Sequence, residues 1–104
     1  MAFGVMGGHM QHQGHVQMVK RVFEFGQNPQ AAIDAPRWHV YPDFTIGLES
    51  GFDQSIASQL VDLGHSVRFE KNESVFGGAQ LILRSENGFV AGSDSRKEGL
   101  AAGY

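Results

Sequence analysis

Apolar residues return at helical spacing in the first quarter of the chain, and this spacing predicts a helix over residues 9–25. The expected buried face of this helix is formed by four apolar side chains: Val16, Val19, Val22 and Phe23. Gly26 follows at the position where glycine commonly ends a helix. Gly14 lies inside the helix, where glycine costs about 1 kcal/mol relative to alanine. We therefore expect a closely packed neighbour at Gly14.

The remainder of the chain alternates short helices with extended segments. Helices are expected at 29–34 and 53–63, and extended segments at 38–41, 44–48, 66–70, 79–86 and 89–93. Asn28-Pro29 is a helix start signal, and Pro36 disfavours continuation of the helix at the residue before it. Asn87-Gly88 is the pair that a type I′ hairpin turn prefers. The pattern predicts an α+β fold with helices packed on a mainly antiparallel sheet.

Leu81, Ile82 and Leu83 are consecutive, so both faces of their strand are apolar. Such a strand is typical of a sheet that is covered on both sides. A chain of 104 residues forms one small domain or a piece of a larger one, and it has difficulty covering both faces of a sheet. This strand is the first indication that a further layer is required.

Composition narrows the possible partners. The net charge is −3 and 18% of residues are charged, which disfavours non-specific binding to nucleic acid or to an anionic membrane. No apolar run approaches the roughly 18 residues that a membrane helix needs. The absence of cysteine excludes disulfides and thiolate metal sites.

Histidines are the first candidates for chemistry. His9, His12 and His15 repeat at three-residue steps, so they share one broad side of the predicted helix. They could present imidazoles to a metal ion, but no H-E-x-x-H pattern accompanies them. A solvated, polar helix entry is the preferred interpretation.

Two further clusters have a structural and a functional interpretation. Asp94 and Arg96 follow the last strand with Glu98 nearby, and we expect ion pairs that fix the C-terminal loop. An aromatic group around two prolines either lines a pocket or packs in the interior: Trp38, Tyr41 and Phe44.

The segment Gly4-Val5-Met6-Gly7-Gly8 precedes the first predicted helix. Two successive glycines before a helix can direct backbone N–H groups at one point, as an oxyanion hole or an anion-binding nest requires. The alternative is a tight turn with no chemical role.

Together with motifs elsewhere, this segment resembles the C-terminal half of the small subunit of γ-glutamyltransferases (γ-glutamyltranspeptidases). The residues that carry the resemblance are Gly4 to Gln11, Gly14-His15, Gln17, Phe25 to Pro29, Ala32, Asp34 to Trp38, Gly77 to Gln80, Gly92 to Asp94, Arg96 and Ala102 to Tyr104. The chain, residues 1–104, is accordingly expected to be a single domain, the C-terminal fragment of such a subunit.

The resemblance implies a part of the αββα sandwich of the N-terminal nucleophile hydrolases. In this family a threonine, exposed by self-cleavage, attacks a γ-glutamyl amide such as glutathione and passes the glutamyl group to water, an amino acid or a peptide. The resemblance assigns the oxyanion-hole amides to Gly7 and Gly8. It implies no cofactor, and it implies two partners for this chain, the large subunit and the N-terminal half of the small subunit.

Two departures from the family pattern leave alternatives open. The single threonine, Thr45, does not match the nucleophile position, so this chain alone is expected to be inactive. Val5-Met6 stands where the better-known transpeptidases carry Ser-Pro, which favours a bacterial branch similar to cephalosporin acylases. The alternatives are therefore a related amidase, such as a cephalosporin or glutaryl acylase, and a non-catalytic α+β module that associates with itself.

Overall fold

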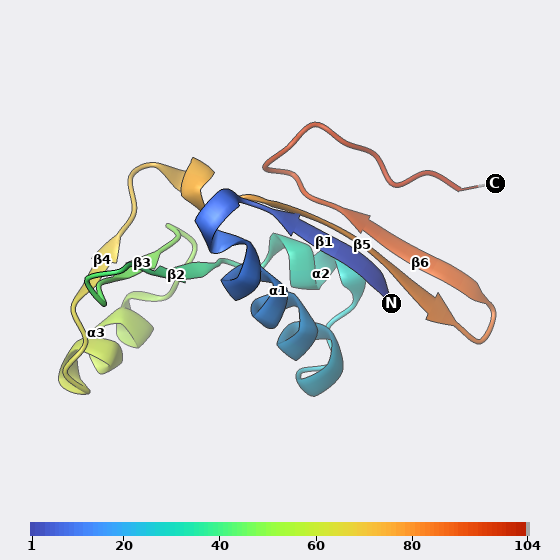
Figure 1. Ribbon diagram of the computed structural model, residues 1–104. Coiled ribbons are helices and arrows are strands. Elements are labelled where there is room, and N and C mark those ends of the chain that lie inside the picture. Colours follow the sequence, from blue (N-terminus) through green and yellow to red (C-terminus); the bar gives the residue numbers. More distant parts are fainter. Residues whose placement is uncertain (104) are drawn as a thin grey trace.

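The computed structural model describes residues 1–103, so Tyr104 of the C-terminal motif lies outside the described residues. The molecule is elongated, 48 × 25 × 20 Å, and two three-stranded sheets lie at its opposite ends (Figure 1). Within residues 1–103, no helix combines the length and the apolar character that crossing a membrane requires.

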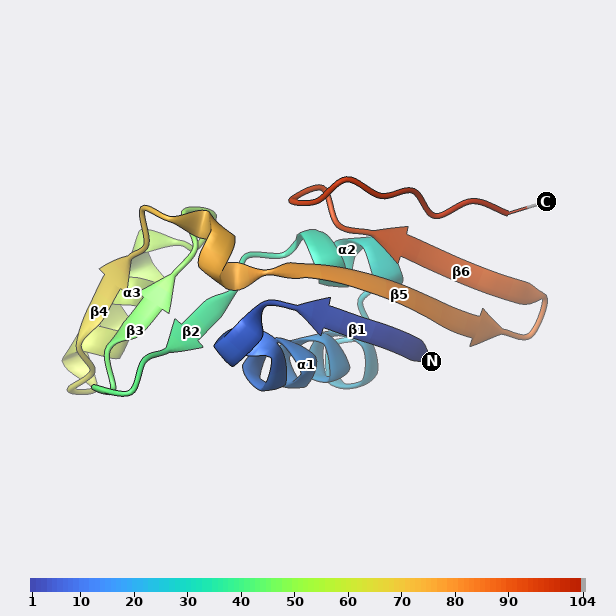
Figure 2. The same cartoon turned by 45° about the horizontal axis from the view of Figure 1, so that its top comes forward.

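The first sheet is antiparallel and carries helices on one face only (Figures 1 and 2). Its strands, in spatial order, are β1 (Ala2–Met6), β5 (Gly78–Ser85) and β6 (Gly88–Ser93). The covering helices are α1 (Gln11–Val19) and α2 (Pro29–Asp34). On the opposite face the C-terminal tail passes over the sheet, with Gly99 beside Gln80 and Ser93.

The second sheet is smaller and mixed. Its strands are β2 (Trp38–Val40), β3 (Ile46–Leu48) and β4 (Val67–Phe69), with β2–β3 antiparallel and β3–β4 parallel. Helix α3 (Gln54–Asp62) packs beside β4. Three short helical segments complete the order: η1 (Gly8–Met10), the π-helical η2 (Lys20–Glu24) and η3 (Glu73–Phe76).

The main core lies between the first sheet and its helices. It consists of Val5, Met10, Met18, Val22, Ala32, Ile33, Phe76, Ala79 and Leu81. In the second sheet and α3, the buried apolar residues are Leu48 and Ala57. Burial is therefore concentrated at one end of the molecule.

The predicted fold class and all three predicted helices are confirmed, but of the predicted buried face of the first helix only Val22 is buried. Val16, Val19 and Phe23 are exposed. The buried positions of α1 are Gly14, Gln17 and Met18. A Cβ at Gly14 would lie 2.7 Å from Val5 Cγ1, so glycine allows the helix to approach β1 closely, as expected. Periodicity missed this face because glycine and glutamine do not count as apolar.

The C-terminal hairpin is confirmed, but the predicted turn is wrong. Ser85 pairs with Gly88, so Glu86 and Asn87 are the two turn residues. A type I′ turn needs positive φ at both central positions, and among described non-glycine residues only Phe44 has a positive φ.

On the β5 strand, Leu81 is 2% exposed and its neighbour Ile82 is 48% exposed. The second apolar face of this strand is therefore open in the described chain.

Polar side chains of α1 bond to the backbone at the edges of both sheets. Gln17 donates to the carbonyl of Trp38 (2.8 Å) and accepts from the same residue's N–H (3.2 Å). Gln13 does the same with Val40 (3.0 and 2.8 Å). On the other side, His15 Nε2 accepts from Val5 N–H at 3.0 Å. Helix α1 therefore joins the two sheets. Strand β1 was not predicted from the periodicity of the sequence, and it leads directly into the Gly7-Gly8 turn.

Candidate functional site

The Gly7-Gly8 turn connects β1 to α1. The carbonyl of Gly7 accepts from Met10 N–H at 3.0 Å, which fixes the turn to the start of the helix. The amides of Gly7 and Gly8 donate no hydrogen bond to another residue of the described chain. Gly8 has φ +56°, and a Cβ there would find no atom within 4 Å. The turn thus holds two adjacent backbone donors without partners in the described chain, with open space at the Cβ position of Gly8.

A second glycine holds the turn from behind. Gly77 has φ +68°, and a Cβ at this position would lie 1.8 Å from the carbonyl oxygen of Met6 and 3.0 Å from Gly7 Cα. Only glycine fits there without moving the end of β1. The position of the Gly7-Gly8 amides therefore depends on the segment 76–79.

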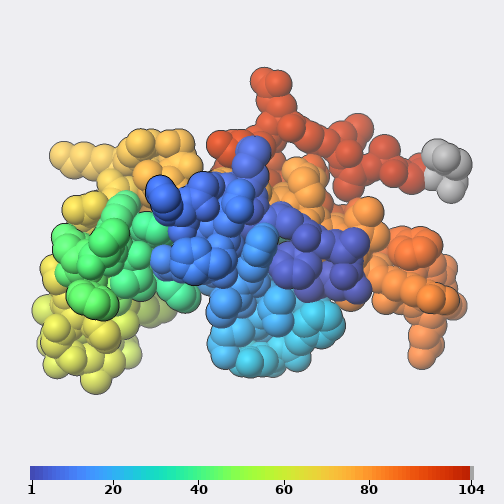
Figure 3. Space-filling model, viewed as in Figure 1, coloured from blue at the N-terminus to red at the C-terminus, as the bar shows by residue number. Residues whose placement is uncertain are grey.

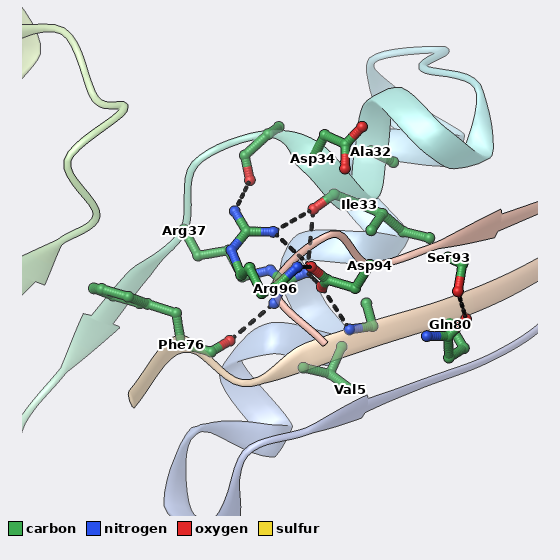
Figure 4. Close-up of polar contacts among 12 residues, drawn as sticks. Val5, Ala32, Ile33, Asp34, Arg37, Phe76, Gln80, Ser93, Asp94 and Arg96 are labelled. Carbon is green, nitrogen blue, oxygen red and sulfur yellow. Dashed lines mark hydrogen bonds and ion pairs between the residues drawn. The ribbon is translucent and has the colours of Figure 1, made fainter. Parts of the chain in front are cut away.

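Four charged side chains form a cluster behind that segment, and Figure 4 labels three of them, Arg37, Asp94 and Arg96. Arg37, Glu49 and Asp94 are buried, and Arg96 is half-buried. Arg37 Nη2 lies 2.5 Å from Asp94 Oδ2, and Arg96 Nη1 lies 3.1 Å from Asp94 Oδ1. Arg96 also donates two hydrogen bonds to Glu49, from Nε to Oε1 at 2.5 Å and from Nη2 to Oε2 at 2.7 Å. Two positive and two negative groups make this charged cluster neutral overall.

The charged cluster holds both ends of segment 76–79. Arg37 Nη1 donates to the carbonyl of Phe76 at 2.9 Å, and Asp94 Oδ2 accepts from Ala79 N–H at 2.7 Å. Gly77, between these two anchors, contacts Met6 and Gly7. Contacts thus run without a gap from the charged cluster through Gly77 to the candidate oxyanion amides.

Burial and pairing act against each other on the pKa values of this cluster. Burial favours the neutral form of Asp94, but donors from Arg96 and Ala79, with Arg37, outweigh burial and hold the Asp94 pKa below its usual value. For Arg96, burial is likewise outweighed by Glu49 and Asp94, so its pKa is raised. For Arg37, burial dominates and lowers the pKa. Asp94 and Arg96 remain charged at neutral pH.

The structure separates the three histidines of the first helix. His15 turns to β1 and accepts from Val5, whereas His9 and His12 face the second sheet beside His39. Within residues 1–103, no three histidine or acidic side chains gather in a way that would hold a metal ion. The described structure therefore does not bring His9, His12 and His15 together as ligands of one metal ion.

The charged group after the last strand and the aromatic group around the prolines also assemble only in part. Asp94 and Arg96 form the expected ion pair, whereas Glu98 pairs with no basic residue of the described chain. The aromatic group does not assemble. Trp38 and Tyr41 line separate hollows, and Phe44 is 81% exposed.

Sequence reasoning did not assign roles to Arg37, Glu49 or His39. Arg37 lies in the Asp-Ala-Pro-Arg-Trp motif, so its place in the resemblance was the available signal. No sequence motif marks Glu49 or His39. Glu49 bonds to Arg96, 47 residues away, and His39 lines a hollow together with residues of another element.

Comparison with known proteins places the whole of this arrangement in one family. Residues 1–104 match the gamma-glutamyltranspeptidase family. The chain is 32% identical to a glutathione hydrolase-like YwrD proenzyme of Bacillus subtilis, covering 97% of this chain and 21% of that protein. It is 31% identical to glutathione hydrolase proenzyme 2 of Schizosaccharomyces pombe, covering 100% of this chain and 17% of that protein. The chain thus spans about a fifth of the length of these relatives.

Solved structures agree with the sequence comparison. A cephalosporin acylase from Bacillus halodurans superposes with a TM-score of 0.92 at 42% identity, over 98% of this chain and 19% of that chain. A gamma-glutamyltranspeptidase from Pseudomonas nitroreducens shares the fold, with a TM-score of 0.84 at 22% identity over 98% of this chain and 54% of that chain. These likenesses confirm the expected α+β architecture of an N-terminal nucleophile hydrolase. The chain belongs to the gamma-glutamyltranspeptidase family.

Proposed function

We propose that this chain is the C-terminal part of an enzyme that cleaves γ-glutamyl amides such as glutathione and transfers the glutamyl group to water, an amino acid or a peptide. The observation that carries the proposal is the pair of unpartnered amides at Gly7 and Gly8, in a chain of this family. Adjacent backbone donors that no other group engages can stabilise a developing oxyanion.

The proposed mechanism divides the chemistry between this chain and the rest of the enzyme. A threonine outside this chain attacks the amide carbon, and its own α-amino group takes the hydroxyl proton. As the carbonyl oxygen becomes negative, it accepts hydrogen bonds from the N–H groups of Gly7 and Gly8. The amine leaves with a proton, and water or an acceptor amine then attacks the acyl-enzyme and releases the threonine.

Two features of the described chain support a positioning role. Gly8 in its left-handed conformation needs no side-chain room, so a substrate can approach its amide closely. The charged cluster and Gly77 fix the turn before substrate arrives, which avoids reorganisation during the reaction. In this proposal the large subunit and the N-terminal half of the small subunit are the partners, and they cover the open face of the first sheet around Ile82.

The test is amide-to-ester replacement at the Gly8 N–H in the full-length protein, assayed with γ-glutamyl-4-nitroanilide. Loss of one oxyanion donor should lower kcat by about 10²- to 10³-fold. Self-cleavage is followed on a gel, and the same amide-to-ester replacement at Gly103, outside the glycine pair and with nothing within 4 Å of its Cβ position, is the control. A correctly processed ester variant with wild-type kcat would refute the oxyanion role of Gly8. A processed wild-type enzyme without γ-glutamyl activity would refute the substrate.

A second candidate is hydrolysis of another amide, and the 42% identity to a cephalosporin acylase favours it. Val5-Met6, where better-known transpeptidases carry Ser-Pro, lies directly before the glycine pair. This candidate keeps the same oxyanion donors and changes the acyl group. Faster release of a glutaryl than of a γ-glutamyl anilide by the processed enzyme would favour the acylase.

A further inference from the structure

A polar hollow lies beside the Gly7-Gly8 turn, between the start of α1 and the second sheet. Figure 3 shows these blue and green regions in contact. The hollow has a volume of about 440 Å³ and is lined by Gly8, His9, His12, Gln13, His39, Val40, Tyr41 and Pro42. We call it the histidine hollow. Because Gly8 is part of its wall, the hollow lies directly beside the candidate oxyanion amides.

The histidine hollow has donors and no acidic side chain on its described lining. His9 and His12 are exposed, so their imidazoles are free to turn toward a ligand. His39 is 8% exposed, and its Nδ1 has no hydrogen-bond partner in the described chain. A buried polar atom without a partner calls for an explanation, and a group bound in the hollow that His39 lines would supply one.

The charges around His39 favour an anion over a cation. Burial lowers the pKa of His39, and His12 and His9 lower it further. Glu70 opposes this shift, but its carboxylate is already engaged by the Tyr41 hydroxyl at 2.6 Å and by Arg68 at 3.2 Å. The Tyr41 ring packs edge-on against His39 at 4.4 Å between centroids. Three imidazoles thus share a hollow without an acidic side chain on its described lining, and Glu70, the acid that acts on His39, is engaged by other partners.

We propose that the histidine hollow binds a carboxylate on the amine side of the amide substrate, the part that leaves in the first step and is the acceptor in the second. This inference rests on the proposed amide chemistry, because it needs the reacting carbonyl at Gly7 and Gly8. The carboxylate accepts hydrogen bonds from the imidazole N–H groups, which gives preference for peptide and amino-acid leaving groups over uncharged amines.

Two chromogenic substrates that differ by one carboxylate test the proposal on the full-length, processed protein. These are γ-glutamyl-3-carboxy-4-nitroanilide and γ-glutamyl-4-nitroanilide, and the measured quantity is the ratio of their kcat/KM values. The wild-type ratio should favour the carboxylated substrate. The double variant His9→Ala/His12→Ala and the variant His39→Phe, which keeps a ring against Tyr41, should each lower the ratio about tenfold. His65→Ala, an exposed histidine at the end of α3, is the matched control.

Binding provides a readout independent of turnover. Calorimetry with glycylglycine and glycylglycinamide should show about tenfold tighter binding of the free carboxylate, and the histidine variants should remove this difference. A ratio of kcat/KM unchanged within twofold in processed variants, or equal affinity for the two dipeptides, would overturn the proposal. An enzyme that cleaves neither anilide refutes the proposed function alone, and the calorimetry then decides the role of the histidine hollow.

Discussion

The two sheets of this chain differ in how completely their apolar and charged side chains are buried. The first sheet closes a core against α1 and α2, and its buried charges are paired within the charged cluster. The second sheet and α3 enclose an apolar groove of about 360 Å³, lined by Trp38, Val40, Ile46, Leu48, Phe52, Ile56 and Leu60. The first sheet with α1 and α2 (the first unit) thus buries a core on one face and leaves its other face open around Ile82. In the second sheet with α3 (the second unit), Leu48 and Ala57 are the buried apolar residues. We expect the second unit to open at a lower free energy than the first.

The largest effect is expected from breaking the charged cluster. Arg37→Leu removes one of the two cationic partners of Asp94 and leaves the buried cluster with one uncompensated negative charge, which should lower the free energy of unfolding by about 3–5 kcal/mol. Arg68→Leu, the matched change in the second unit, breaks an exposed pair and should cost less than about 1 kcal/mol. Urea denaturation measures both values. Equal effects would mean that the cluster does not distinguish the two units.

Acid titration sharpens this comparison. The pKa of Asp94 in the folded state lies below its unfolded value of 3.8, so its ionised form stabilises the fold. This stabilisation is present in full above the unfolded pKa and is lost as pH falls through the folded one. The wild-type protein and Arg37→Leu should therefore begin to converge in stability as pH falls below about 3.8, and converge fully below the folded pKa of Asp94. A difference that persists undiminished in stronger acid would show that Arg37 acts mainly through its carbonyl contacts.

Gly77→Ala should have the next largest effect, because its methyl group would overlap the Met6 carbonyl and the residue would keep a positive φ. We expect about 2–4 kcal/mol of destabilisation and loss of self-cleavage in the full-length protein. Gly4→Ala, on the same strand as Met6 with no atom within 4 Å, is the control and should change neither. Thermal unfolding and processing on a gel measure the two effects separately.

The contact between the two units should contribute less. Gln17→Ala leaves the N–H and carbonyl of Trp38 without partners and should cost about 1–3 kcal/mol. Gln13→Ala should cost less, because Gln13 is only half-buried and water can replace its amide. Hydrogen exchange at Trp38 and Val40 should accelerate in the matching variant. Exchange that accelerates equally throughout the chain would mean that the two units open together.

The smallest effect is expected in the apolar groove. Leu60→Ala should cost about 1 kcal/mol, because the side chain is already half-exposed. Leu81→Ala in the first unit should cost about 2–5 kcal/mol. Urea denaturation of the two variants gives the comparison directly. A loss at Leu60 as large as that at Leu81 would show that the groove is closed in solution.

Sequence signals such as helix caps and hydrophobic periodicity predicted most of the helices and strands. They failed where contacts between distant residues determine which side chains are buried. Asn28 caps α2 through a bond from Ala31 N–H, as its sequence position predicts. The buried face of α1 could not be predicted, because Gly14 and Gln17 are selected by contacts with β1 and β2 that lie far along the chain. In the candidate site, the glycine pair was identified by its spacing, and Asp94 with Arg96 by proximity. Glu49 and His39 required the fold itself.

The glutamine bonds between α1 and β2 have a geometric consequence. Four residues of an α-helix advance about 6.0 Å. Two residues of a β-strand advance about 6.6–6.8 Å. Gln13 and Gln17, four residues apart on the helix, therefore lie opposite Val40 and Trp38, two residues apart on the strand. Each further pair of this kind would increase the difference between helix and strand advance by about another 0.7 Å. A helix can thus imitate a neighbouring strand only briefly, which suits a β2 of three residues and leaves no continuous edge there for pairing with another chain.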